Sequence, residues 1–408
     1  MRSKMIPLSV RWSFLLFVLT LPFETLDVGF ARDSLSVSKV ACLLFFGCYF
    51  LFCSPFFGKR PFPRPFPALW WFLGYLAIYW ISALFIDPQF AGMAQKYVVT
   101  FLQLVVFLWI TTDLLKNQRM RENTLLTYAM STVCLAVGII FGLPGFETST
   151  AWDGRTTAFG ANANEMAGIM AIAVLILVNF RVKKVFKHFL SKILFPVLTL
   201  PLLLIIVKTG SRTGALALVC GFLVYFLPYW RSKRSMTVII IAICGIGALL
   251  YLIATNPHTM ERWKQARTGD LSERDKTIPI ALAMISERPI FGWHPVASAY
   301  EINARRGLKG SMDAHNLLLS MLAEVGVVGT IPFFVGLWLS FRAAWMSRRG
   351  DLGLMPLSLL LAVLALHMGN PLVLWKPFWL VMGLTLATTS TPAMKQASSR
   401  DFFWPAHP

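Results

Sequence analysis

The sequence has few charged residues, and this scarcity excludes most kinds of soluble protein. Charged side chains make up 14% of the 408 residues, whereas hydrophobic side chains make up 56%, and the mean hydropathy is +0.64. Soluble globular domains usually have about a quarter of their residues charged. The composition therefore predicts an all-α polytopic membrane protein.

Acidic residues are scarcer still, with 19 Asp and Glu against 38 Lys and Arg and a net charge of +19. In a soluble chain this excess would point to nucleic acid. Here the basic residues fall mainly between apolar runs, which is the usual pattern of cytoplasmic membrane loops. We therefore expect membrane lipid as a partner and no nucleic acid.

Cysteine and histidine are also few, and neither shows a metal-ligand pattern. All six cysteines lie inside apolar stretches, so they are interpreted as small core residues rather than as disulfides or zinc ligands. The six histidines are scattered, and the outer carboxylates are not clustered. No nucleotide-binding loop is present either. The sequence thus predicts chemistry without metal, nucleotide or other cofactor.

Apolar runs are abundant. A membrane-spanning helix needs about 20 mostly apolar residues, and on that measure the sequence predicts twelve spans, the last two separated only by Gly369-Asn370-Pro371. The predicted spans cover residues 8–23, 39–57, 68–86, 95–113, 123–142, 162–180, 189–207, 212–230, 236–254, 315–341, 352–370 and 372–389. The predicted organisation is nine spans in 1–254, a polar segment at 255–314, three spans in 315–389 and a tail at 390–408.

The charges of the loops predict the orientation. An even number of spans places both termini on one side, and the loops of that side carry most of the Lys and Arg with few acids. Both termini are therefore expected in the cytoplasm. The polar segment 255–314, with nine Lys or Arg and seven Asp or Glu, is expected on the opposite face. In a bacterial inner membrane this is the periplasmic face.

The polar segment is too long to be a simple connector, so we expect functional residues in it. Ile278, Leu282 and Ile285 recur at spacings of four and three. This pattern predicts a short amphipathic helix on the membrane face, with Pro279 in its first turn. Residues 301–310 are polar and basic.

His315 is the histidine that best suits catalysis. It is the only one at the start of an expected apolar helix, capped by Ser311 or Asp313 and followed by Asn316. A helix N-terminus disfavours the imidazolium, which leaves a neutral ring able to accept a proton. The alternative is an interfacial histidine with satisfied hydrogen bonds. Glu324 is expected on the other side of the helix and is interpreted as structural.

Lys208 and Arg212 form a second candidate site, because cations on the outer face are exceptions to the positive-inside pattern. They flank a tight Gly-Ser turn that is expected to open a helix, where backbone N–H groups and a planar guanidinium suit phosphate oxygens. The alternative is interfacial snorkelling. Arg274 is flanked by acids and is expected to open the amphipathic helix, and the alternative for it is a solvated surface pair. Arg288 is a weaker candidate, because it would also serve as an anchor of the helix end.

Several motifs together resemble the O-antigen ligase and polymerase superfamily. The stretch HNLLL at 315–319, continuing to AEVGVVG at 323–329, resembles the signature of that family. The elements RPIFG at 288–292 and SRTG at 211–214 resemble its upstream motifs. The turn at 159–165, which holds Asn162 and Asn164, resembles a further one. The family often has a glycine two residues after Gly292, where this chain has His294.

The resemblance implies a bundle related to the GT-C membrane glycosyltransferases. Enzymes of this kind take a glycan from undecaprenyl diphosphate to an acceptor hydroxyl on the outer face, without metal or nucleotide. By resemblance, His315 is the catalytic base, and Arg212 and Arg274 bind the diphosphate. The further candidate substrate-binding residues are Arg288, Lys208, Asn316, Asn162 and Asn164.

The sequence leaves the acceptor open. The basic run at 301–310 suits a phosphorylated lipid A core, which favours an inverting O-antigen ligase. An O-antigen polymerase and a protein O-oligosaccharyltransferase are alternatives in the same superfamily. A transporter or flippase is an alternative from another class, but such proteins commonly have repeated halves with broken helices. Here the polar residues are concentrated in one outer segment.

Overall fold

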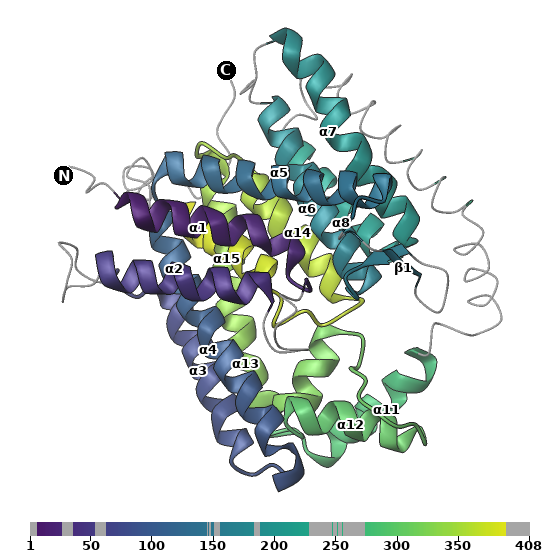
Figure 1. Ribbon diagram of the computed structural model, residues 1–408. Helices are drawn as coiled ribbons and strands as arrows, with labels where there is room; N and C mark the ends of the chain where they lie inside the picture. The colour runs from purple at the N-terminus through teal and green to yellow at the C-terminus, as the bar shows by residue number, and fades with distance from the viewer. Residues whose placement is uncertain are drawn as a thin grey trace, which may run out of the picture.

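The computed structural model is a bundle of helices (Figure 1). It describes residues 6–26, 36–53, 63–144, 146, 148–150, 156–182, 188–227 and 274–388, together with 247, 251 and 255. The helices are α1 (Leu8–Thr20), α2 (Val37–Cys53), α3 (Pro67–Ala83), α4 (Ala91–Leu114), α5 (Gln118–Phe141), α6 (Ala163–Val182), α7 (His188–Thr209), α8 (Arg212–Phe226), α11 (Arg274–Glu287), α12 (Pro295–Arg305), α13 (Leu317–Met346), α14 (Met355–His367) and α15 (Lys376–Thr388).

Four helical stretches are long and apolar enough to cross a membrane, namely Pro88–Leu114, Gln118–Phe141, Ala163–Val182 and Leu317–Arg349. Six shorter apolar helices accompany them in the part of the chain that the structure describes. The structure therefore agrees with a helical membrane protein. Helices occupy eleven of the twelve predicted span regions, whereas all of span 236–254 except residues 247 and 251, and the whole tail 390–408, lie outside the described residues. Because many of these helices have fewer than about 20 residues, the count of twelve stays a prediction.

Helices α6, α8 and α14 pack closely because glycines remove side chains where they cross. A Cβ at Gly214 would lie 2.3 Å from the Cβ of Ala167, and one at Gly221 would lie 2.4 Å from Leu175. Ser358 of α14 donates a hydrogen bond of 2.7 Å to the carbonyl oxygen of Gly221. These contacts fix the start of α8 against the start of α6.

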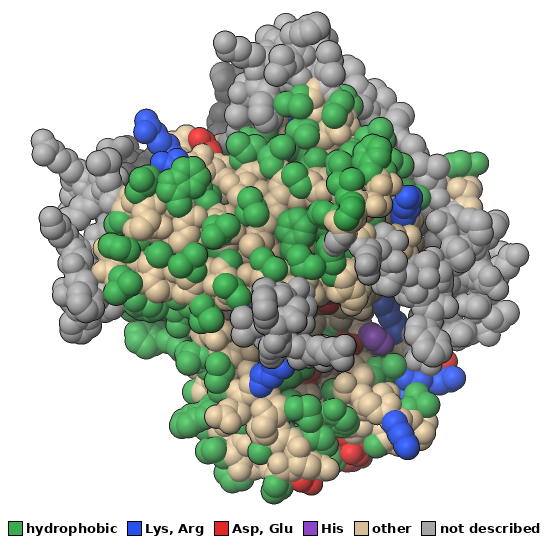
Figure 2. Space-filling view, in the orientation of Figure 1, with side chains coloured by type: hydrophobic (Ala, Val, Ile, Leu, Met, Phe, Trp, Pro, Cys, Tyr) green, Lys and Arg blue, Asp and Glu red, His purple; other side chains and the backbone are tan. Residues whose placement is uncertain are grey.

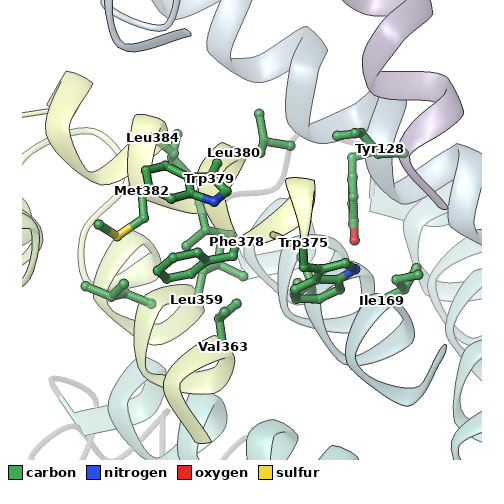
Figure 3. Close-up of a cluster of buried hydrophobic side chains, with 14 of the residues drawn as sticks. Tyr128, Ile169, Leu359, Val363, Trp375, Phe378, Trp379, Leu380, Met382 and Leu384 are labelled. Atoms are coloured by element: carbon green, nitrogen blue, oxygen red, sulfur yellow. The ribbon is translucent and has the colours of Figure 1, made fainter. Parts of the chain in front are cut away.

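The core between α5, α6, α14 and α15 is rich in aromatic side chains (Figure 3). Tyr128, Phe378 and Trp379 are almost completely buried, and the rings of Phe378 and Trp379 meet with their centroids 5.5 Å apart. The indole N–H of Trp379 donates to the carbonyl oxygen of Val373 at 2.7 Å. This bond ties the turn before α15 to the core.

Helices α11 and α12 lie together at one end of the bundle (Figure 1) and pack against α13. The prediction that Pro279 stands in the first turn of its helix is wrong, because α11 already includes Arg274 and the residues between. Its buried face holds Thr277 and Met284, while Leu282 is 52% exposed. Ile278 and Ile285 are half-buried, so the described residues cover only part of the apolar face predicted from the sequence.

Helix α12 and a small β-hairpin were not predicted. Strand β1 (Thr148–Thr150) pairs antiparallel with β2 (Thr156–Ala158), with Thr148 opposite Ala158. The hairpin contacts α6 and α7 and leads into the asparagine turn before α6. Three-residue strands with so little apolar alternation are hard to distinguish from loop in a sequence.

Candidate functional site

Gly326 breaks α13 into two helices. Residues next to this break form backbone hydrogen bonds with residues 289–294 of the polar segment. The backbone of Gly326 has φ 61° and ψ −169°. The N–H groups of residues 327–328 donate to the carbonyls of 289–290 at 2.9 and 3.2 Å. The N–H groups of 293–294 donate to the carbonyls of 323–324 at 2.8 and 2.7 Å. Two motifs that are separate in the sequence are therefore one hydrogen-bonded joint.

Glycine is required on both sides of this joint. A Cβ at Gly292 would lie 2.6 Å from the carbonyl group of Glu324, and one at Gly326 would lie 2.2 Å from the carbonyl oxygen of Ile290. Both residues also have positive φ, which suits glycine. His294, where the resembling family often has glycine, has φ +69°. The backbone at this position therefore has the positive φ that favours glycine, although the residue is histidine.

The ring of His294 is buried beside Tyr79, with the two ring centroids 5.2 Å apart. Only 3% of its surface is exposed, and burial lowers the pKa of the imidazole to about 4. Nδ1 accepts the N–H of Val296 at 3.2 Å and caps α12. Nε2 is buried and has no partner among the described residues. His294 is therefore neutral near pH 7.

The Ser-Arg turn and the asparagine turn are bonded to each other. Ser211 is the N-cap of α8, which begins at Arg212, and its Oγ accepts the N–H of Gly214 at 3.0 Å. The prediction that this turn opens a helix is confirmed. The same hydroxyl donates to Oδ1 of Asn164 at 2.8 Å, and Asn162 Oδ1 accepts the N–H of Asn164 at 2.8 Å.

Arg274 reaches the same place from the polar segment. Its Nη2 donates to the carbonyl oxygen of Gly369 at 3.3 Å. Gly369 lies in the turn between α14 and α15, and a Cβ on it would lie 2.3 Å from Cγ2 of Thr213. The side chain of Arg274 and the residue after Arg212 therefore meet at one stretch of backbone, which the sequence marked only as a break between spans.

His315 does not begin α13, so the predicted helix start is wrong by two residues. Helix α13 begins at Leu317, and the side chain of Asn316 accepts the N–H groups of the next two residues at 3.0 and 3.2 Å. Asn316 is therefore the cap, rather than Ser311 or Asp313, because its side chain reaches these N–H groups. His315 has φ +50° and stands outside the helix.

Asp313 holds His315 at two points. Its Oδ1 accepts the backbone N–H of His315 at 2.7 Å and lies 2.9 Å from Nδ1 of the ring. A neutral ring bonded in this way has its proton on Nδ1 and a lone pair on Nε2. The side chain of His315 is 29% exposed. The arrangement presents a basic nitrogen at a partly open surface.

The expectation that Glu324 and His315 lie on opposite sides of one helix is wrong, because His315 is outside the helix. A structural role of Glu324 stays a prediction.

The remaining candidates differ in their surroundings. Lys208 lies in the last turn of α7 with an exposed side chain. Arg288 stacks its guanidinium 4.0 Å from the ring centroid of Trp293. Within the basic run, Arg305 donates twice to Glu287, at 2.6 Å for both bonds, and once to Glu301 at 2.8 Å. These bonds lower the pKa of Glu287 and raise that of Arg305.

The surface in Figure 2 separates two regions. Hydrophobic side chains are spread over the helical bundle, whereas Lys and Arg gather with Asp and Glu over the α11–α12 end. A histidine side chain lies next to basic side chains at the hollow between the two regions. On this face, histidine and basic side chains therefore lie together where the α11–α12 end meets the bundle.

The helical fold and the long apolar helices are those of a membrane protein, and on the face in Figure 2 charged side chains gather around α11 and α12. Residues 197–334 match the family model described as O-antigen ligase, and this match supports the resemblance to the O-antigen ligase superfamily. The matched stretch contains Arg212, Arg274 and His315 as well as the joint around Gly326. A search of curated proteins finds no match to this chain.

Proposed function

We propose that this protein is an O-antigen ligase that transfers a glycan from undecaprenyl diphosphate to a hydroxyl of lipid A core. We place the reaction on the periplasmic face of a bacterial inner membrane, with both chain termini in the cytoplasm. The observation that carries the proposal is the convergence of Arg274 and the Ser-Arg turn at Gly369, with the Asp313–His315 pair in the same matched stretch.

The donor diphosphate is held at the start of α8 and beside Arg274. A helix N-terminus favours an anion, and Arg212 stands in its first position. Two guanidinium groups offer planar forks to the diphosphate oxygens. Lys208 and Asn162 supply further polar contacts, while Asn164 and Asn316 keep the turns in shape through their bonds. Arg288 is the weakest of these candidates, because its guanidinium stacks on Trp293.

The acceptor is activated by His315. Nε2 takes the proton of the acceptor hydroxyl as its oxygen forms a bond to the anomeric carbon. The bond between that carbon and the diphosphate oxygen breaks, and undecaprenyl diphosphate leaves with the electron pair. Asp313 keeps the ring oriented and stabilises the imidazolium that forms. A single displacement inverts the anomeric configuration and leaves no sugar on the enzyme.

The ion pairs of Arg305 favour a second candidate acceptor, another lipid-linked glycan. Arg305, in the basic run that suits a phosphorylated core, is already paired with Glu287 and Glu301. Fewer cations are then left in this run for acceptor phosphates. An O-antigen polymerase, which extends one lipid-linked glycan with another, is therefore the second candidate, and transfer to a protein hydroxyl belongs to the same reaction class.

The test uses purified protein in nanodiscs with a lipid-linked glycan and a chelator. Lipid A core, a second lipid-linked glycan and an acceptor protein are offered in separate reactions, and mass spectrometry identifies any joined product. The ligase proposal requires joining to lipid A core by wild type, and joining that is slower by about 100-fold or more in His315→Ala. Joining only to the second glycan establishes the polymerase, and glycan translocation without any joined product establishes a flippase.

A further inference from the structure

We infer that Gly369 is a positioning residue of the diphosphate site, because its missing side chain lets Arg274 and the Ser-Arg turn meet. The inference rests on the proposed function and extends it to the turn between α14 and α15. This turn contributes no charge and no catalytic group. It acts through the arginine that it holds.

Two contacts define the position. The carbonyl oxygen of Gly369 accepts Nη2 of Arg274 at 3.3 Å. On the other side, a Cβ at Gly369 would lie 2.3 Å from Cγ2 of Thr213 and 3.2 Å from Nη2 of Arg274. Real Cβ atoms do not approach a carbon atom to 2.3 Å, so any other residue forces a movement.

The need for glycine here is steric. Gly369 has no left-handed φ, unlike Gly292 and Gly326. An alanine would therefore fit the backbone of this turn, and only the neighbouring atoms forbid it. This separates the effect of Gly369 from the backbone strain that a substitution at Gly326 would cause.

Thr213 is not free to yield. Its side chain is β-branched and rotates little, and its hydroxyl lies 3.2 Å from Oγ of Ser211. Ser211 is bonded to Asn164, and Gly214 is in close contact with Ala167. A Cβ on Gly369 would therefore move the α14–α15 turn, and the carbonyl that Arg274 uses would move with it.

Movement of the Gly369 carbonyl is expected to weaken binding of the diphosphate donor. With Nη2 held by the carbonyl of Gly369, the other N–H groups of the guanidinium are left in a fixed direction for diphosphate oxygens. Once the carbonyl moves, Arg274 loses its orientation. A hydrogen bond to a charged group is worth enough that its loss weakens binding by about tenfold or more. The Asp313–His315 pair is left in place.

The experiment measures binding of undecaprenyl diphosphate in nanodiscs, together with the KM values for donor and acceptor. Gly369→Ala is compared with Thr213→Ser, with the double variant and with Gly92→Ala, where a Cβ would meet no atom within 4 Å. Thr213→Ser removes Cγ2 and keeps the hydroxyl. We expect Gly369→Ala to weaken donor binding and raise donor KM by about tenfold or more, to leave acceptor KM unchanged, and to be rescued in the double variant.

Several outcomes overturn the inference. These are normal donor binding by Gly369→Ala, an equal rise in acceptor KM, or no rescue by Thr213→Ser. If Gly369→Ala does not fold, the double variant decides, because it has to fold and bind donor nearly as well as wild type. A wild-type protein that does not bind undecaprenyl diphosphate contradicts the proposed function itself. In that case melting temperatures still test the contact, since Thr213→Ser has to relieve the loss caused by Gly369→Ala.

Discussion

Gly292 and Gly326 face each other backbone to backbone, and the N–H of Trp293, next to Gly292, is bonded 2.8 Å from the carbonyl oxygen of Ala323. The two glycines are 34 residues apart in the sequence. Their contact joins the end of α11 to the kink of α13. The polar end, with Arg274 at the start of the described part of α11, is held on the bundle through this joint.

The joint predicts that Gly326→Ala is severely destabilising. The variant combines a left-handed φ with a collision at 2.2 Å, so we expect a loss of at least about 3 kcal/mol or no folded protein. Gly353→Ala is the matched control, because Gly353 has φ +60° and no atom within 4 Å of the built Cβ. The control should lose about 1 kcal/mol. Equal melting temperatures of the two variants in detergent would contradict the role of the joint.

The two arginines are expected to act as planar forks rather than as simple charges. Negative charge develops on the diphosphate as it leaves, and bidentate donors stabilise it more in the transition state than in the ground state. Arg212→Lys and Arg274→Lys should each lose about tenfold or more of kcat/KM while the protein stays folded. Arg349→Lys makes the same change at an exposed arginine outside the proposed site and serves as the control. If either lysine variant has normal activity, that arginine does not stabilise the leaving diphosphate through paired hydrogen bonds.

The Asp313–His315 pair predicts that substituting either residue lowers the transfer rate, and that the loss is larger for His315. His315→Ala removes the base and should slow transfer about 100-fold or more with donor binding nearly unchanged. Asp313→Asn retains an oxygen for the N–H of His315 but no longer stabilises the imidazolium, so the loss should be smaller, about tenfold. Single-turnover transfer and donor binding are measured separately. A glycosyl-enzyme trapped in either variant, or a product of retained configuration, would exclude the proposed mechanism.

His294 predicts a loss of stability in acid. Its pKa is about 4 in the folded protein because the ring is buried, and it is about 6.5 in an unfolded chain. As the pH falls from about 6.5 to 4, the unfolded chain binds a proton that the folded protein does not, so stability declines. The loss approaches about 3 kcal/mol, since one pKa unit corresponds to about 1.4 kcal/mol.

His294→Asn is the control for this loss, because asparagine tolerates a positive φ and does not titrate. The difference in unfolding free energy between wild type and this variant should shrink as the pH falls from about 6.5 to 4. A constant difference across that range would show that the ring is protonated equally in both states.

The proposed orientation predicts that the two ends of α13 are reached from opposite sides of the membrane. Single cysteines replace Lys309 and Arg349, which are both exposed, in a protein that lacks the six native cysteines. An impermeant thiol reagent added to intact cells should label position 309 and leave position 349 unlabelled until the cells are opened. Labelling of both positions from outside would reject the orientation.

The kind of fold was predictable because hydrophobic runs are local signals. Eleven predicted span regions contain helices, and the Ser211 turn was correctly placed at a helix start. Helix ends were less predictable, since they depend on which polar side chain reaches the first free N–H groups. Asn316 takes this role, so the helix starts at Leu317 rather than at His315.

The sequence by itself determined that the chain is a helical membrane protein and which polar residues stand apart from its apolar runs. Spacing along one chain carries this information, because a helix and its turns are made of near neighbours. Only the tertiary structure decided that Arg274 meets Thr213 at the backbone of Gly369, and that two distant glycines form one joint. Such contacts depend on how closely packed helices approach each other in space, and no local pattern of residues specifies that distance.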